Sequence, residues 1–198
     1  MSISFFEQEN MSSDGSFSDY DLAEKGRTIP VLVDLIKKVE LKGFTYGGDT
    51  RSASKAYTDV GLKKIFIKKD KSLDEACLSL AYELTNAINK EKLEAIHAEY
   101  LNDKRKTEER ATEYAHHILN IEVEAVLVRS VVAVETSAEK YVKNPKYNLI
   151  VKECGACLEL AKRTIFKEMI ENGKVHNGKI KAVDFYKDQY YRFAASRI

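Results

Sequence analysis

The chain has 198 residues, and its 32 basic and 31 acidic side chains leave a formal net charge of +1. This length supports one substantial hydrophobic core, and the balanced charge gives no general attraction to nucleic acid or to an anionic membrane. The charged fraction of 32%, the two prolines and the absence of tryptophan favour a helical protein over a sandwich or barrel. The longest apolar stretch, residues 121–134, contains charges and is shorter than the ~20 residues that cross a bilayer. We therefore expect no nucleic-acid partner and no membrane span.

Residues 1–26 are rich in Ser, Asp and Glu and poor in branched apolar side chains. This composition is typical of a flexible acidic tail. The segment lacks the basic start and the apolar run of a signal peptide. Three cysteines without the spacing of a disulfide framework suit a reducing compartment. These features predict a cytoplasmic protein with a flexible amino terminus.

The ordered part is predicted to form one domain over residues 27–198. Pro30 suits the first turn of a helix, and the apolar residues that follow it predict a helix up to Leu41. Short strands are predicted over residues 44–46 and 62–69, and in the second of these Ile65 and Ile67 point to the same side. We expect these strands to form a small antiparallel sheet.

The next helix is marked by a capping box, because Glu75 follows Ser72 by three residues. Apolar residues then recur at steps of three and four, which predicts a helix with one buried stripe that continues to Leu101. The stripe consists of Leu73, Cys77, Leu80, Leu84 and Ala87.

The second half of the chain is also expected to be mainly helical. Residues 121–138 are apolar nearly all round and rich in valine, so their periodicity leaves helix and strand open. Residues 146–171 predict a long amphipathic helix that ends at Asn172-Gly173, and a last helix is predicted over residues 182–195. The fold class is therefore α+β: a mostly helical domain in which a small sheet precedes the helix that starts near Ser72.

Cys154 and Cys157 have C-x-x-C spacing inside the long helix predicted above. A redox site needs a preceding strand in a βαβ context, and a structural zinc site needs a second pair of ligands. The sequence shows neither. We therefore expect both thiols to be packed in the helix and to react slowly in the folded protein.

Residues 79–88 read Ser-Leu-Ala-Tyr-Glu-Leu-Thr-Asn-Ala-Ile. This segment resembles the active-site helix of the zincin metallopeptidases, where the pattern is roughly Leu-Ala-His-Glu-Leu-Thr-His-Ala. Tyr82 and Asn86 occupy the positions of the two zinc-binding histidines, and Glu83 occupies that of the catalytic glutamate. Residues 122–125, Glu-Val-Glu-Ala, resemble the segment that supplies a third ligand, here Glu124. The order of helix, strand and motif helix is also that of zincins, and the resemblance covers about residues 30–135.

The residues at these positions suit zinc catalysis poorly. Tyr82 and Asn86 are four residues apart and project from one face of the helix. A catalytic zinc site has three protein ligands drawn from imidazole, thiolate and carboxylate groups, whereas a phenol with a pKa near ~10 and a neutral amide are weak replacements. Without a bound ion, Glu83 has no activated water. We expect no metal and no other cofactor: Glu83 is a vestigial catalytic residue, and Tyr82, Asn86 and Glu124 are vestigial metal positions.

The favoured hypothesis is a catalytically inactive zincin-like protein that acts by binding another protein. The resemblance implies a bacterial secreted effector or its regulator, delivered into a host cytosol or cytoplasmic. Two alternatives stay open: an active metallopeptidase with atypical ligands, such as His116 or His117, and a helical interaction module unrelated to zincins, in which the motif is an ordinary polar helix face. Because Glu124 lies in an apolar run, we also expect Tyr82 and Asn86 to donate hydrogen bonds to Glu124 or to Glu122.

Overall fold

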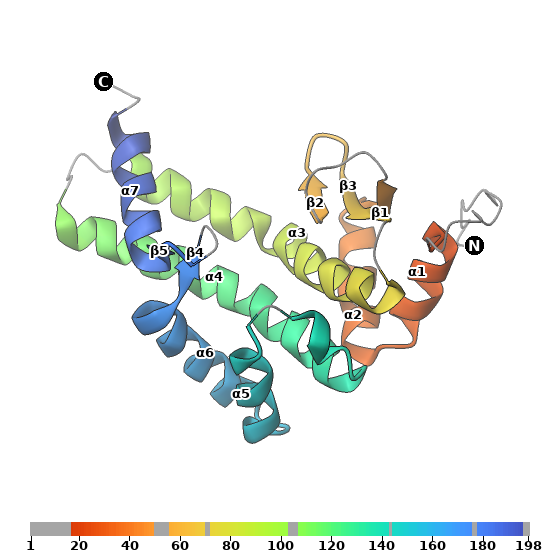
Figure 1. The fold of residues 1–198 in the computed structure, drawn as a ribbon. Helices are drawn as coiled ribbons and strands as arrows, with labels where there is room; N and C mark the ends of the chain where they lie inside the picture. Colours follow the sequence, from red (N-terminus) through yellow and green to blue (C-terminus); the bar gives the residue numbers. More distant parts are fainter. Residues whose placement is uncertain are drawn as a thin grey trace. The chain divides into compact units, whose positions relative to one another are not determined.

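The computed structural model describes residues 17–49, 56–69, 72–102, 107–142, 144–175 and 178–195. The described chain is mostly helical, with a small three-stranded sheet near its amino-terminal end (Figure 1). It groups into two compact units, the first made of residues up to Ile88 together with Val128–Pro145, and the second of Asn89–Leu127 together with Lys146–Ile198. Helices α3 (Leu73–Asn102) and α4 (Glu108–Glu135) each contribute a part to both units.

The sheet of the first unit follows two helices, α1 (Asp19–Arg27) and α2 (Pro30–Leu41). Its strands are β1 (Thr45–Asp49), β2 (Ala56–Asp59) and β3 (Lys64–Lys68), in the order β1-β3-β2. β2 pairs antiparallel with β3, but β1 pairs parallel with β3, so the expectation of an antiparallel sheet was wrong. The reason is topological: the chain reverses at β2 and again at β3, which leaves β1 and β3 pointing the same way.

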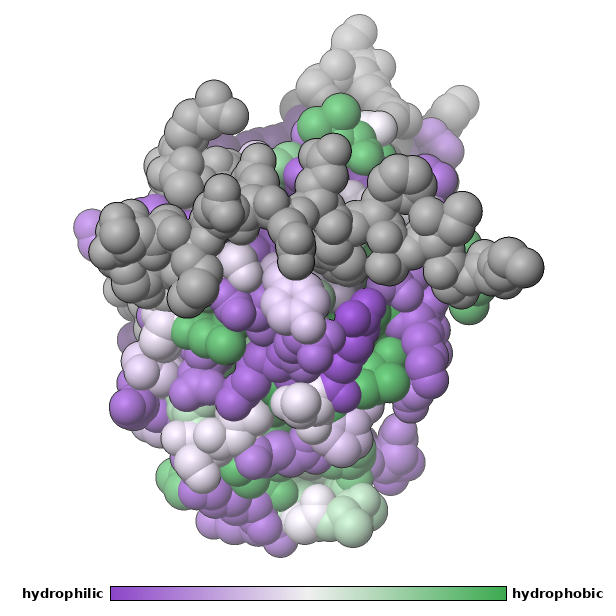
Figure 2. Space-filling view, turned by 90° about the vertical axis from the view of Figure 1, so that its right-hand side faces the viewer, coloured by the Kyte–Doolittle hydropathy of each residue, from purple (hydrophilic) through white to green (hydrophobic). Residues whose placement is uncertain are grey.

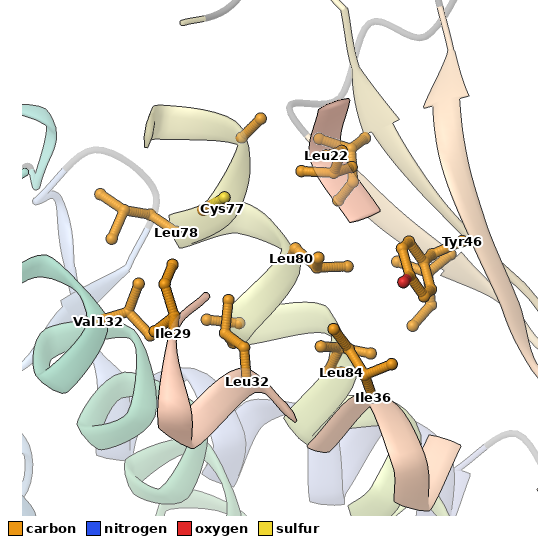
Figure 3. Close-up of a cluster of buried hydrophobic side chains, with 14 of the residues drawn as sticks. Leu22, Ile29, Leu32, Ile36, Tyr46, Cys77, Leu78, Leu80, Leu84 and Val132 are labelled. Atoms are coloured by element: carbon orange, nitrogen blue, oxygen red, sulfur yellow. The ribbon is translucent and has the colours of Figure 1, made fainter. Parts of the chain in front are cut away.

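The core of the first unit lies between its helices and its sheet. Figure 3 shows side chains from α2 and α3 pointing toward one another, with Tyr46 of β1 and Val132 of α4 at the edges of the cluster. The predicted stripe of α3 is confirmed at Cys77, Leu80, Leu84 and Ala87, which are all buried. The backbone N–H of Glu75 donates to the Ser72 hydroxyl at 3.3 Å, as the predicted N-cap requires.

Helix α1 lies within the segment that was expected to be a flexible tail. Ser18 and Asp21 cap each other through reciprocal hydrogen bonds, 3.1 Å from the Asp21 N–H and 2.8 Å from the Ser18 N–H. Leu22 and Ala23 of this helix are buried in the core of the first unit. The predicted boundary at residue 26 was therefore wrong for residues 17–26, and the rest of the predicted tail lies outside the described residues.

The second unit has an aromatic core. Besides its parts of α3 and α4, this unit contains α5 (Lys146–Cys154), α6 (Leu158–Asn172), the two-residue strands β4 (Lys174–Val175) and β5 (Ile180–Lys181), and α7 (Ala182–Ala195). Tyr100, Tyr114 and Tyr190 are buried together, with ring centroids 5.7–5.8 Å apart. The last helix has the predicted bounds, and the segment whose state the sequence left open is helical as part of α4.

The prediction of one long helix over residues 146–171 was wrong, because this segment forms two helices, α5 and α6. Gly155 has a φ of 55°, a left-handed conformation that ends α5. Helix α6 starts three residues later, at Leu158. Among the described residues, no helix has the length and the apolar composition that crossing a membrane requires.

Candidate functional site

The motif positions on α3 form a polar face in the first unit. Tyr82, Glu83 and Asn86 are each half-buried. The Thr58 hydroxyl donates to Oε2 of Glu83 at 2.8 Å. Thr58 belongs to β2, an outer strand of the sheet. Glu83, which occupies the position of the catalytic glutamate in the zincin pattern, is therefore hydrogen-bonded to β2 through the Thr58 hydroxyl.

A cation lies near the same face. Arg129 belongs to the part of α4 in the first unit and is partly buried. Burial lowers the pKa of its guanidinium from the ordinary value, and the electrostatic influence of the Tyr82 and Glu75 side chains acts in the opposite direction. The Arg129 guanidinium and the Tyr82 side chain therefore influence each other electrostatically.

Glu124, the predicted third ligand, lies in the second unit among nitrogen donors. Its Oε2 accepts a hydrogen bond of 2.6 Å from the Asn89 amide, and its Oε1 lies 2.8 Å from Nζ of Lys162. Nζ of Lys92 is 3.4 Å from Oε2. Burial alone would raise the pKa of Glu124, but the hydrogen bonds from Lys162 and Asn89 and the two lysine charges outweigh it and hold the pKa below its ordinary value. We call these four residues the Glu124 cluster.

Glu122 also has a partner within the second unit. The Tyr186 hydroxyl is hydrogen-bonded to it, and burial, together with this carboxylate, raises the pKa of the Tyr186 phenol. The hydrogen bond that we expected from Tyr82 or Asn86 to Glu124 or Glu122 would join residues of different units, and it stays a prediction. Within their own unit, both glutamates are occupied by other donors.

The histidines pack against aromatic rings. His97 stacks on Tyr114 at 5.9 Å between centroids, His117 is tilted against Tyr100 at 5.6 Å, and His116 meets Phe166 edge-on at 6.3 Å. His176 lies outside the described residues. In the part of the chain that the structure describes, no three residues of the types His, Cys, Asp and Glu come together as a group that could hold a metal ion.

The two cysteines of the C-x-x-C segment do not lie together in one helix, contrary to the prediction. Cys154 ends α5 and is half-buried, whereas Cys157 is the N-cap of α6 and is exposed. Gly155 explains why the structure departs from the prediction. Its positive φ ends α5 at Cys154, so the predicted helix does not continue to Cys157. Cys77 is the buried cysteine of the chain.

Sequence reasoning missed Thr58, Arg129 and Lys162 as partners of the motif residues. One signal was present: Arg129 interrupts an apolar run, and a charged residue in such a run needs a partner when it is buried. Lys162 had no comparable signal, because a lysine on an amphipathic helix is ordinarily solvated.

Comparisons of the chain with protein-family models, with curated proteins and with solved structures give no match.

Proposed function

We propose that the protein acts by binding another protein and has no peptidase activity, as a degenerate relative of the zincins. Support comes first from the motif itself, in which Tyr82 and Asn86 replace both imidazoles of the zincin pattern. The hydrogen bond from Thr58 occupies one carboxylate oxygen of Glu83. The two lysines beside Glu124 supply the positive charge that a metal would otherwise provide. Each carboxylate that a metallopeptidase would need thus has a partner of another kind.

The observation that carries the binding proposal is a group of three exposed leucines on α5 and α6, two helices that lie side by side in the second unit (Figure 1). Leu149, Leu158 and Leu160 have exposed fractions of 55%, 43% and 52%. Figure 2 shows one face of the molecule, where hydrophobic side chains lie in small groups among hydrophilic ones. Exposed leucines on two neighbouring helices supply apolar side chains that a partner could bury. We call them the leucine surface.

The binding proposal is tested with Leu158→Glu/Leu160→Glu in the full chain. Both positions are in the first turn of α6, where a negative charge is compatible with the helix dipole, so the variant should fold. The bait is incubated with extracts of the source cells and, separately, of candidate host cells, and the captured proteins are quantified by mass spectrometry. We expect one partner to be captured by the wild type and lost from the double variant.

The matched control is Leu62→Glu, because Leu62 is 68% exposed and belongs to the first unit. This control should capture the same partner as the wild type. Equal capture by all three proteins would contradict the leucine surface as the binding site. Reversible self-association of the wild type in sedimentation, abolished in the double variant, would instead make a second copy of this chain the partner and overturn the proposal.

The absence of peptidase activity is tested by restoring the imidazoles. We expect the wild type to purify without stoichiometric zinc and its melting temperature to be unaffected by a chelator. Tyr82→His/Asn86→His should gain zinc binding, because two histidines four residues apart on a helix can share one ion. If Glu124 is the third ligand that the zincin resemblance implies, a further Glu124→Gln change weakens this binding. One equivalent of zinc in the wild type, lost together with stability on chelation, would contradict the proposal.

The origin of the motif is tested by the same variants. Zinc binding that does not depend on Glu124 would favour the helical interaction module unrelated to zincins. It would leave the binding function intact, because the leucine surface does not involve the motif. The wider assignment to secreted effectors or their regulators rests on the resemblance, and it predicts that the partner is a host protein or another effector.

A further inference from the structure

The turn between α5 and α6 has a cysteine at each end, Cys154 and Cys157. The backbone N–H of Cys157 donates to the carbonyl oxygen of Cys154 at 3.1 Å, and Gly155 between them has a φ of 55°. A four-residue turn closed in this way holds its outer Cα atoms within about 7 Å. Disulfides form across Cα separations of about 4.4–6.8 Å. The backbone spacing of this turn is therefore compatible with a bond between the two sulfur atoms.

The two thiols differ in their access to solvent, which gives them separate roles. Cys157 is exposed and its neighbours Gly155 and Ala156 are exposed as well, whereas Cys154 is half-buried. Cys157 is the N-cap residue of α6, and its side chain makes no capping hydrogen bond. Cys157 is thus placed to meet a reagent from solution, and Cys154 is placed to react next.

Cys77 supplies an internal contrast. It is buried in the core of the first unit, and burial raises the pKa of its thiol to about 12. A buried, protonated thiol is a poor nucleophile. The three cysteines of the chain therefore differ in access: Cys77 is buried, Cys154 is half-buried and Cys157 is exposed.

We propose that Cys154 and Cys157 form a dithiol site that exchanges electrons with small-molecule disulfides of the glutathione type. The Cys157 thiolate attacks one sulfur of oxidised glutathione, forms a mixed disulfide and releases one molecule of glutathione. Cys154 then loses its proton to solvent and attacks Sγ of Cys157, which releases the second glutathione and closes the Cys154–Cys157 disulfide. The protein loses two thiol hydrogens, and one molecule of oxidised glutathione is reduced to two of glutathione. Excess reduced glutathione reverses both steps.

The site lies next to the leucine surface in sequence, because Cys157 immediately precedes Leu158. The inference does not depend on the proposed binding function, since thiol exchange can be measured on the isolated protein. A disulfide here would cross-link the turn that connects α5 with α6. Whether oxidation alters partner capture is a separate measurement.

The test uses the reduced full chain incubated with oxidised glutathione under native conditions, quenched with an alkylating reagent and analysed by intact mass and peptide mapping. We expect the wild type to lose the mass of two hydrogens, with the disulfide mapped to Cys154 and Cys157. Cys154→Ser should accumulate one glutathione on Cys157, because the resolving thiol is missing. Cys157→Ser should react about ten-fold more slowly, because the remaining thiol is half-buried.

The matched control is Cys77→Ser, which should be oxidised at the same rate as the wild type. Two results would overturn the proposal. One is a wild-type protein that carries glutathione on both cysteines without closing the bond, which would show that the sulfur atoms do not meet. The other is a wild type whose Cys154 and Cys157 stay reduced until denaturant is added.

Discussion

Glu124 combines partial burial with three nitrogen partners, and this combination determines how the side chain responds to acid. Its side chain is 25% exposed, and Lys162, Lys92 and Asn89 all contact its carboxylate. These partners favour the ionised form, so the pKa of Glu124 in the folded chain lies below the ordinary value of 4.5. A glutamate with a lowered folded-state pKa stabilises the fold above the unfolded-state pKa. That contribution is lost as the pH falls through the folded-state pKa.

We therefore predict that Glu124→Gln lowers the free energy of unfolding by about 1–3 kcal/mol at pH 7, because the two lysines lose their charged acceptor. The difference between wild type and variant should narrow as the pH falls from the ordinary pKa of 4.5 through the lower folded-state pKa, where the carboxylate of the folded wild type becomes protonated. Urea denaturation followed by circular dichroism over a pH series measures both effects. Glu153→Gln, at an exposed position, should change the free energy by less than about 0.5 kcal/mol. A loss at Glu124 that is the same at every pH would contradict the charge-based explanation.

The sequence could identify Glu83 and Glu124 as carboxylates that need partners, but it could not identify the partners. Glu83 is bonded to a residue 25 positions earlier, and Glu124 to Lys162, 38 positions later. Such pairs depend on the tertiary arrangement, and no local pattern encodes them. The cap of α3 at Ser72 could be predicted from local sequence, because its two groups are three residues apart.

At the scale of elements, the Asp19 side chain connects α1 to β1 through a hydrogen bond. Its Oδ1 accepts a hydrogen bond of 2.6 Å from the N–H of Gly48 and lies 3.5 Å from Nζ of Lys69. A Cβ on Gly47 would come within 2.7 Å of Asp19 Oδ2. The absence of a side chain at Gly47 is thus what lets the carboxylate of α1 approach the strand.

Gly47→Ala should therefore lower the free energy of unfolding by about 1–3 kcal/mol, because the new methyl group forces Asp19 away from Gly48. In an Asp19→Ala background the same substitution should cost less, since the carboxylate that it would strike is absent. A double-mutant cycle by chemical denaturation measures this coupling. Gly61→Ala is the control, because its nearest atom would lie 3.4 Å away. Additive effects of the Gly47 and Asp19 substitutions would contradict the contact.

Helices and strands in which apolar residues recur at regular steps were predicted well. Very short strands, and a helix divided by a glycine, were not. The stripe of α3 and the alternation of β3 each bury one side, so their patterns are visible in the sequence. Strand β2 has four residues, all of intermediate burial, and therefore shows no alternation to detect. The break between α5 and α6 depends on the backbone conformation of Gly155, and a glycine within an apolar pattern is compatible with either a continuous helix or a stop.

At the scale of the whole molecule, buried tyrosines shape the response to alkaline pH, and the chain has eleven tyrosines in all. Burial raises the pKa of Tyr114 to about 12 and also raises the pKa of Tyr46 and of Tyr186. Folding therefore favours the neutral phenols over their phenolates. This contribution is fully present below the ordinary pKa of 10 and is lost as the pH rises through the folded-state values. We expect the chain to unfold in alkali, with the buried phenols ionising in the same transition.

Tyr114 gives the sharpest test of this expectation, because its hydroxyl is buried and has no hydrogen-bond partner among the described residues. Tyr114→Phe removes an unpaired polar group and an ionisable one, while the ring can keep its contacts with Tyr100 and Tyr190. At pH 7 the free energy of unfolding should stay unchanged or rise by up to about 1 kcal/mol, and the midpoint of alkaline unfolding should move to higher pH. Circular dichroism reports the unfolding, and the ultraviolet absorbance of phenolate reports the ionisation. Tyr20→Phe, at a position that is 60% exposed, should leave the midpoint unchanged. A loss of more than about 1 kcal/mol in Tyr114→Phe at pH 7 would instead mean that the hydroxyl makes a hydrogen bond in solution, since that is the net worth of a typical buried one.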